Sequence, residues 1–152
     1  MQEDTKYMKL ALKEAEKALK KEEVPIGAVI VCKEKVVGRG HNLKEHTNDP
    51  TAHAEIIAIR EAAANLNSWR LADCQLYVTI EPCPMCAGAM LQARIKRLVY
   101  GADDEKAGVI NSLYKLVEDN RFNHTIIVKS VVLVEESIKL MQEFFQKLRK
   151  KC

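Results

Sequence analysis

The sequence predicts an α/β protein in which a layered sheet opens with a hairpin and continues through parallel crossovers. Two observations carry this prediction. Short β-branched runs alternate with amphipathic segments, and the first two runs are separated only by the charged turn Lys33-Glu34-Lys35. No GxGxxG follows a predicted strand, which excludes a doubly wound dinucleotide binder. No repeat, linker or low-complexity segment interrupts residues 1–152, so we expect a single domain.

The spacing of apolar residues places each element in order. The predicted strands cover residues 26–32, 36–39, 76–80, 95–100 and 125–133. The predicted helices cover residues 3–21, 53–66, 85–93 and 135–150. The start of the third helix is marked by Pro84, because proline is tolerated in the first turn of a helix.

The composition excludes several classes of protein. Hydrophobic residues make up 47% and charged residues 30%, as expected of a soluble globular chain. No apolar run approaches the roughly 20 residues that span a membrane, and the first residues lack the apolar core of a secretory signal. We therefore expect a cytoplasmic protein with no membrane partner. The net charge of +3 permits an acidic partner but does not by itself indicate nucleic acid.

The five cysteines are an odd number without the spacing of a disulfide framework. Structural disulfides are not expected in a reducing compartment. Cys32 follows an apolar run and Cys74 precedes a predicted strand. Both are interpreted as small, half-buried hydrophobic residues rather than ligands.

Two short motifs carry the chemistry, His53-Ala-Glu55 and Pro82-Cys-Pro-Met-Cys86. Both are predicted where a helix begins, and there the free N–H groups and the helix dipole stabilise a thiolate. Two thiolates and one imidazole suit a tetrahedral zinc ion, and a set of three leaves the fourth position open for water, as in a catalytic site. Glu55 is close enough in sequence to exchange protons with the zinc-activated water.

Each motif alone has a simpler interpretation. A CxxC pair is also typical of redox and structural sites, His53 could cap a helix, and Glu55 could be an ordinary first-turn acid favoured by the dipole. The combination is much more specific. An H-x-E motif followed by P-C-x-x-C, with a helix between them, is the signature of the zinc-dependent nucleobase deaminases.

The chain also resembles the bacterial tRNA-specific adenosine deaminases of the cytidine-deaminase superfamily, from the first predicted strand to the last. The matching segments are Val24-Pro-Ile-Gly-Ala-Val-Ile30, Gly40-His-Asn42, Asp49-Pro-Thr-Ala-His-Ala-Glu55, Glu81-Pro-Cys-Pro-Met-Cys-Ala-Gly-Ala89, Ala93-Arg-Ile-Lys-Arg97, Gly101-Ala-Asp103, Lys106-Ala-Gly108 and Asn123-His124. The sequence departs from the pattern at Asn111 and Val131, where small, glycine-like positions are expected, and its C-terminal end is less rich in arginine.

The resemblance implies a three-layer α/β/α sandwich with a five-stranded mixed sheet, assembled as a homodimer with one zinc ion per chain. It assigns three zinc ligands, His53, Cys83 and Cys86, and makes Glu55 the catalytic proton shuttle. It assigns the substrate-binding residues Asn42, Ala54, Asn123 and His124.

The function implied by the resemblance is hydrolytic deamination of adenosine to inosine at the first (wobble) anticodon position of tRNA. Bases of an anticodon loop are partly unstacked, so extruding one costs less than extruding it from a duplex. A deaminase of free guanine or of a free nucleoside would keep the same zinc and shuttle residues and remains an alternative. A structural-zinc, RNA-binding module without catalysis is a second alternative, but it needs a fourth protein ligand and none is spaced convincingly.

Two surface predictions complete the interpretation. Met85, Met90 and Leu91 are expected to line the homodimer interface. The candidate tRNA phosphate contacts are the basic residues Lys147, Arg149, Lys150 and Lys151 at the end of the last helix. The same charges would also suit a solvated helix end, because they complement the dipole.

Overall fold

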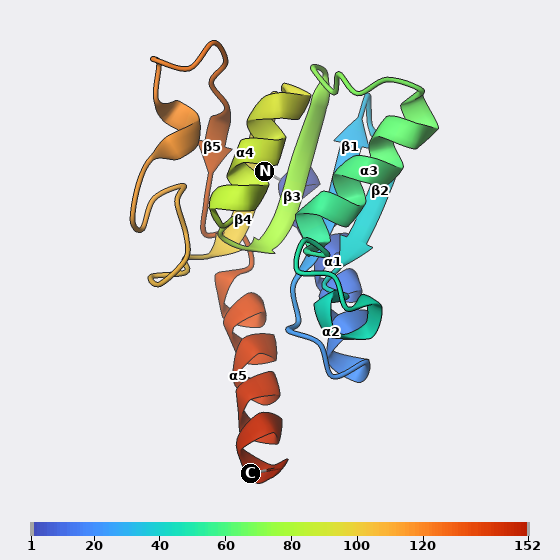
Figure 1. Cartoon of the computed structure of the whole chain (residues 1–152), viewed down its shortest axis with the longest axis vertical. Helices are drawn as coiled ribbons and strands as arrows, with labels where there is room; N and C mark the ends of the chain where they lie inside the picture. The colour runs from blue at the N-terminus through green and yellow to red at the C-terminus, as the bar shows by residue number, and fades with distance from the viewer. Residues whose placement is uncertain (1, 152) are drawn as a thin grey trace.

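The computed structural model describes residues 2–151, with side chains as far as residue 150. It contains one five-stranded sheet, in the order β2-β1-β3-β4-β5, with helices on both faces (Figure 1). The strands are β1 (Gly27–Cys32), β2 (Lys35–His41), β3 (Cys74–Ile80), β4 (Arg97–Ala102) and β5 (Ile127–Lys129). The helices are α1 (Gln2–Lys20), α2 (Lys44–Thr47), α3 (Ala54–Leu66), α4 (Pro84–Ala93), the 3-10 helix η1 (Leu116–Glu118) and α5 (Val134–Lys151).

The sheet is mixed, as the sequence predicts. Strand β1 is antiparallel to both of its neighbours, β2 and β3, whereas β3, β4 and β5 are parallel to one another. The β1–β2 hairpin turns at Lys33 and Glu34, whose φ angles of 51° and 67° match the two left-handed residues of a type I′ turn. The predicted fold class, an α/β/α sandwich around a five-stranded mixed sheet, is confirmed.

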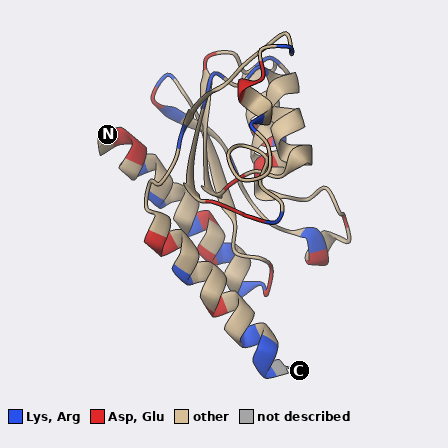
Figure 2. Cartoon of the chain, turned by 90° about the vertical axis from the view of Figure 1, so that its left-hand side faces the viewer, with Lys and Arg blue, Asp and Glu red and all other residues tan. Residues whose placement is uncertain are grey.

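Each face of the sheet has its own core, because successive side chains of a strand point to opposite faces. On one face Val29, Tyr77 and Val99 pack with residues of α1. On the other face Ile30, Leu76 and Leu98 pack with residues of α3 and α4. Helix α5 lies beside α1, and the view turned by 90° shows the two together on one side of the strands (Figure 2).

Two glycines of β2 allow α3 to lie unusually close to the sheet. A Cβ atom at Gly38 would collide with the Ala58 carbonyl, and one at Gly40 would collide with the Ala54 carbonyl. The close approach fixes the start of α3 against the end of β2, where two of the predicted site residues lie.

The structure differs from the predictions mainly near the C-terminal strand. Strand β5 has three residues rather than the predicted nine, and its C-terminal end comes early because the backbone turns left-handed at Val131 and Leu133 (φ 59° and 54°). The glycine-like conformation expected at Val131 is therefore present, although valine is strained in it. Asn111 is not among the residues with positive φ.

Helices α2 and η1 were not predicted from the sequence, since each is a single turn without apolar periodicity. Among the residues that the structure describes, no helix is both long enough and apolar enough to cross a bilayer.

Candidate active site

The sheet brings the beginnings of α3 and α4 to the same edge. Strands β2 and β3 are both antiparallel to β1, so they are parallel to each other and their carboxyl ends meet at one edge. Helix α4 follows β3 directly, and α3 follows β2 after the short helix α2. His53 is the N-cap of α3 and Cys83 the N-cap of α4. The predicted position of both motifs at helix starts is confirmed.

His53, Cys83 and Cys86 form one cluster. The His53 Nδ1 atom lies 3.6 Å from the Cys83 sulfur and 3.5 Å from the Cys86 sulfur, and the three ligand atoms all lie within 4.8 Å of one another. Zinc bonds of about 2.3 Å to sulfur and about 2.0 Å to nitrogen, at a tetrahedral angle, place these atoms about 3.5 Å apart. The cluster therefore fits zinc. It supplies three donors from the described residues, one fewer than a closed structural site needs.

The pKa values of the two cysteines are shifted in opposite directions. Hydrogen bonding from Cys86, with a further contribution from His53, outweighs burial and lowers the pKa of Cys83 to about 4. The Cys83 thiolate and burial raise the pKa of Cys86, and hydrogen bonding to Cys83 raises the pKa of His53. The cluster thus holds one thiolate and one thiol near neutral pH, and a divalent cation would displace the second thiol proton.

Glu55 lies in the first turn of α3, against the cluster. Its side chain is buried, and its carboxyl group interacts with the Cys86 thiol. Burial raises the pKa of Glu55 to about 7, and the Cys83 thiolate acts in the same direction. A carboxyl group in this range can both accept and donate a proton at neutral pH.

Asn42 connects the end of β2 to the start of α3. It is buried, and its Oδ1 atom accepts a hydrogen bond of 2.8 Å from the main-chain N–H of Ala54. This bond satisfies one of the free N–H groups at the start of the helix and holds His53 and Glu55 at the edge of the sheet. Among the described residues, the Asn42 side-chain nitrogen has no acceptor, so it is available to donate to a bound molecule.

Glu81 was not assigned a role from the sequence, although it precedes the cysteine motif. Its buried carboxylate accepts hydrogen bonds from the main-chain N–H groups of Asp104, Ile110, Asn111 and Ser112 and from the Ser112 hydroxyl. Burial alone would raise the pKa of Glu81, but these hydrogen bonds stabilise the carboxylate and hold its pKa below the ordinary value. The segment 104–112 is thereby fixed beside the loop that carries Cys83, and the Val109 N–H also donates to the Pro82 carbonyl.

Comparison with known proteins identifies the family. A family model for MafB19-like deaminases matches residues 2–149. The tRNA-specific adenosine deaminase of Bacillus subtilis is 49% identical over 151 residues, which are 99% of this chain and 94% of that one. The chain belongs to the tRNA-specific adenosine deaminase family.

One solved structure supports the deaminase assignment, and a second supports only the fold. A structure from work on A-to-I editing by tRNA:A34 deaminases at the wobble position of transfer RNA is 45% identical, with a TM-score of 0.86. The match covers 90% of this chain and 99% of the other. The guanine deaminase of Nitrosomonas europaea has a TM-score of 0.78 at 22% identity, over 92% of this chain and 83% of that one. That second likeness shows the fold alone.

Two predicted substrate-binding residues of the deaminase lie away from the cluster. Asn123 and His124 precede β5, and a hydrogen bond of 2.8 Å joins His124 Nε2 to the Ile95 carbonyl just before β4. Because β3, β4 and β5 are parallel, these residues lie at the opposite end of the sheet from Cys83. The single chain does not bring them to the His53, Cys83 and Cys86 cluster, and their contact with substrate remains a prediction.

The structure also shows where the residues predicted for the dimer interface and for tRNA phosphate contacts lie. Met90 and Leu91 are buried in the chain's own core, so the prediction that they line a dimer interface is wrong; Met85 is half-buried. Lys147, Arg149 and Lys150 are exposed at the end of α5, which projects from the edge of the sheet where β3 ends (Figure 1). The side chain of Lys151 lies outside the described residues.

Proposed function

We propose that the protein hydrolytically deaminates adenosine to inosine at the first anticodon position of a tRNA. The observation that carries this proposal is the buried Glu55 carboxyl group against a three-donor metal cluster, in a chain nearly half identical to tRNA-specific adenosine deaminases. A three-donor cluster beside a buried acid supports catalysis over a closed structural site.

His53, Cys83 and Cys86 would hold one zinc ion. When bound, zinc would polarise a water molecule for attack on C6 of adenine. Glu55 would accept one proton from that water and deliver it to N1 of the ring. The carboxylate would then take the remaining proton from the new C6 hydroxyl and pass it to the amino nitrogen, so that the C6–N bond breaks, ammonia leaves and the C6 carbonyl of inosine forms. The burial of Glu55 keeps it out of exchange with bulk solvent between these transfers.

Asn42 and Ala54 would orient the substrate. The amide nitrogen of Asn42 can donate to the ring or the ribose, while its oxygen remains bonded to the Ala54 N–H. Because the nitrogen of Asn42 would bind the substrate while its oxygen binds the start of α3, the substrate would be held in a fixed position relative to Glu55. The extruded base of an anticodon loop would reach this edge of the sheet at a cost of only a few kcal/mol.

An RNA substrate must also be held by its phosphates. The exposed basic residues Lys147, Arg149 and Lys150 are candidates, because α5 projects beyond the edge of the sheet that carries the metal-binding residues (Figure 2). Asn123 and His124 at the other end of the sheet would meet a different part of a large substrate.

A comparison of substrates tests this proposal. The zinc-loaded protein is incubated separately with unmodified tRNA, free adenosine and free guanine, and the products are measured by mass spectrometry of nucleosides and bases. We expect inosine from tRNA and negligible turnover of the free compounds. Xanthine from guanine, or inosine from free adenosine at a higher kcat/KM than from tRNA, would favour a deaminase of small substrates. Binding of tRNA with no product would favour the RNA-binding module.

A further inference from the structure

A second pair of cysteines lies at the opposite end of the sheet from the metal-binding residues. Cys32 ends β1 and Cys74 begins β3, and the two are direct partners in the antiparallel register. Both are free thiols. Strand β3 has seven residues, so at about 3.3 Å per residue the pair is about 20 Å from the cysteines that follow this strand.

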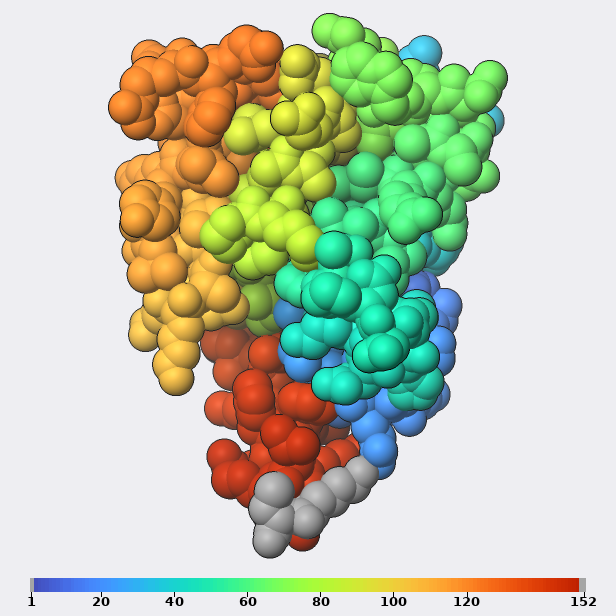
Figure 3. Space-filling view, viewed as in Figure 1, coloured from blue at the N-terminus to red at the C-terminus, as the bar shows by residue number. Residues whose placement is uncertain are grey.

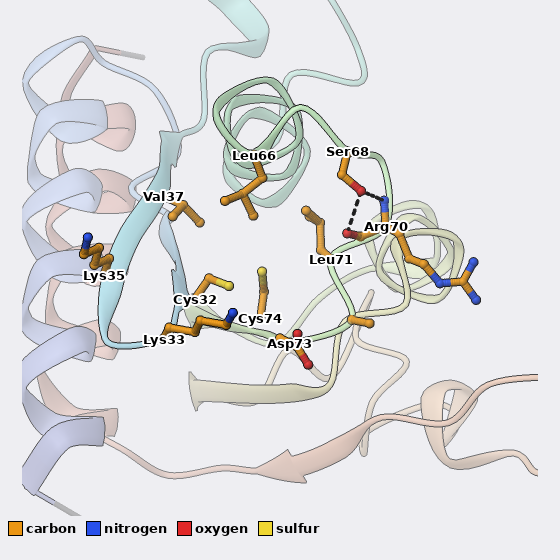
Figure 4. A pocket seen from close by; sticks show the side chains of 11 residues that line it. Cys32, Lys33, Lys35, Val37, Leu66, Ser68, Arg70, Leu71, Asp73 and Cys74 are labelled. Atoms are coloured by element: carbon orange, nitrogen blue, oxygen red, sulfur yellow. Dashed lines mark hydrogen bonds between the residues drawn. The ribbon is translucent and has the colours of Figure 1, made fainter.

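The backbone places the two cysteines in the closer of the two antiparallel arrangements. The Cys74 N–H donates to the Leu71 carbonyl, and the Cys74 carbonyl accepts from the Lys96 N–H, so neither group is directed to Cys32. Non-hydrogen-bonded partners have Cα atoms about 4.5 Å apart, which is within the range that a disulfide can bridge. The two sulfur atoms also point toward each other (Figure 4).

The two cysteines differ in their exposure to solvent. Cys74 is 1% exposed, whereas Cys32 is only partly buried, and both line a surface hollow of about 490 Å³. An incoming molecule therefore meets the sulfur of Cys32 first, and Cys74 lies behind it. This is the arrangement of an attacking thiol and a resolving thiol.

The hollow is predominantly basic. Lys33, Lys35 and Arg70 line it, together with the acid Asp73. Its charge favours a small molecule that carries carboxylates, and the thiols favour one that contains a reactive sulfur–sulfur bond.

We propose that Cys32 and Cys74 form a reversible dithiol site that reacts with small anionic disulfides. The Cys32 thiolate attacks one sulfur of the disulfide, whose S–S bond breaks and releases one thiol, leaving a mixed disulfide on Cys32. The Cys74 thiolate then attacks the Cys32 sulfur and releases the second thiol. The protein dithiol is oxidised by two electrons to a Cys32–Cys74 disulfide, the small disulfide is reduced to two thiols, and the two cysteine protons leave with them.

The raised pKa of Cys74, to about 12, has burial as its main cause and the neighbouring Cys32 as its second. The resolving step is therefore faster at alkaline pH, and the mixed disulfide accumulates transiently near pH 7. The closed disulfide would link β1 to β3 across a ring of about 40 residues and restrict the unfolded chain.

The test uses oxidised glutathione on the intact, zinc-loaded protein. Remaining thiols are blocked with a maleimide, the protein is digested, and the peptides are identified by mass spectrometry while zinc content is followed. We expect a Cys32–Cys74 cross-link that dithiothreitol reverses, no loss of zinc, and an unfolding midpoint raised by about 4 °C or more. Cys74→Ser should stop at a glutathionyl group on Cys32, and Cys32→Ser should leave Cys74 unreacted. Cys152→Ser is the matched control and should react as wild type.

Three results would overturn the proposal. One is that both thiols remain free for the maleimide after oxidation. Another is that the mixed disulfide on Cys32 persists in the wild-type protein at alkaline pH. The third is that the first cross-link joins Cys83 to Cys86 with release of zinc. Peptide mapping of the wild-type protein is sufficient for all three, so the conclusion does not depend on whether the serine variants fold.

Discussion

Glu55 differs in its surroundings from Glu61, the other acid of α3. Glu61, two turns further along α3, is exposed and accepts a hydrogen bond from the Arg39 N–H, whereas Glu55 is buried against the Cys86 thiol. Glu55 is not part of the cluster of three candidate metal donors, so the catalytic role proposed for it can be tested separately from metal binding.

Replacing Glu55 should therefore abolish turnover without loss of metal. We expect Glu55→Gln to bind about one zinc ion per chain and to lose about 10²–10⁴-fold in kcat, the range typical of a general acid–base residue. Glu61→Gln is the matched control and should keep normal activity. Elemental analysis and single-turnover kinetics on the same preparations measure both quantities. Near-normal turnover in Glu55→Gln would assign the proton transfers to another group.

At the scale of secondary-structure elements, an ionic network ties α1 to the sheet. The buried Asp4 carboxylate accepts hydrogen bonds from Arg97 in β4 (2.8 and 2.9 Å), Lys129 in β5 (2.9 Å) and the Tyr77 hydroxyl in β3 (2.9 Å). Hydrogen bonding from Arg97 is the main reason that the pKa of Asp4 is held far below its ordinary value. The network connects one helix to three parallel strands.

Stability should consequently depend on pH through Asp4. A carboxyl group whose pKa is depressed by folding stabilises the native state above its unfolded pKa of about 3.9, and the contribution is lost as the pH falls toward the folded pKa. We expect Asp4→Asn to cost about 1–3 kcal/mol of unfolding free energy at pH 7, with the deficit about 1 kcal/mol smaller at pH 3. Urea denaturation at both pH values measures it, and Glu3→Gln, an exposed neighbour, is the control. A deficit that is the same at both pH values would show that Asp4 acts only by packing.

How well each element could be predicted depends on where its determinants lie in the sequence. The clustering of His53, Cys83 and Cys86, with Glu55 beside them, could be predicted because these residues occur in two short motifs beside helix starts. Glu81 could not, because the main-chain donors it binds come from residues 104–112 and have no side-chain signature. The length of β5 was overestimated because β-branched residues favour a strand, whereas the left-handed backbone at Val131 ends it.

At the scale of the whole molecule, α4 presents an uncovered face. The space-filling view shows it between α3 and the segment that follows β4 (Figure 3). Gly88 lies within α4, and a Cβ atom added there would have no neighbour within 4 Å. We propose that this face, rather than Met90 and Leu91, is the homodimer interface. The exposed side chains of Leu113 and Tyr114 would extend it.

A side chain at Gly88 tests the dimer. Gly88→Glu should fold normally, since the chain leaves space for it and glutamate favours a helix more than glycine by about 0.5–1 kcal/mol. In a dimer that buries this face, the same charge would have no room. We expect the wild-type protein to sediment at twice the mass of one 17.2 kDa chain and the variant to dissociate. A monomeric wild-type protein at micromolar concentration would contradict the dimer, and a dimeric variant would place the interface elsewhere.

A second prediction at the scale of the whole molecule concerns the basic residues at the end of α5. Removal of all residues after Leu148 should weaken tRNA binding without loss of zinc and should affect KM more than kcat, because the tail binds ground and transition states alike. For every phosphate that the shortened chain no longer neutralises, the slope of log affinity against log salt should fall by about 0.7 on a single-stranded loop and about 0.9 on a duplex. Removal of Cys152 alone is the control. Equal affinities and slopes for the two shortened chains would show that the basic residues are only solvated.

The most direct test of the proposed function is the position of the product in the RNA. An anticodon stem-loop with adenosine at its first anticodon position is incubated with zinc-loaded protein, and inosine is located by nuclease mapping with mass spectrometry. A second stem-loop carries its only loop adenosine at another position. We predict inosine at the first anticodon position of the first RNA, none in the second, and none in either with Glu55→Gln. Equal conversion of both RNAs, or conversion that persists in the Glu55 variant, would contradict the proposed function.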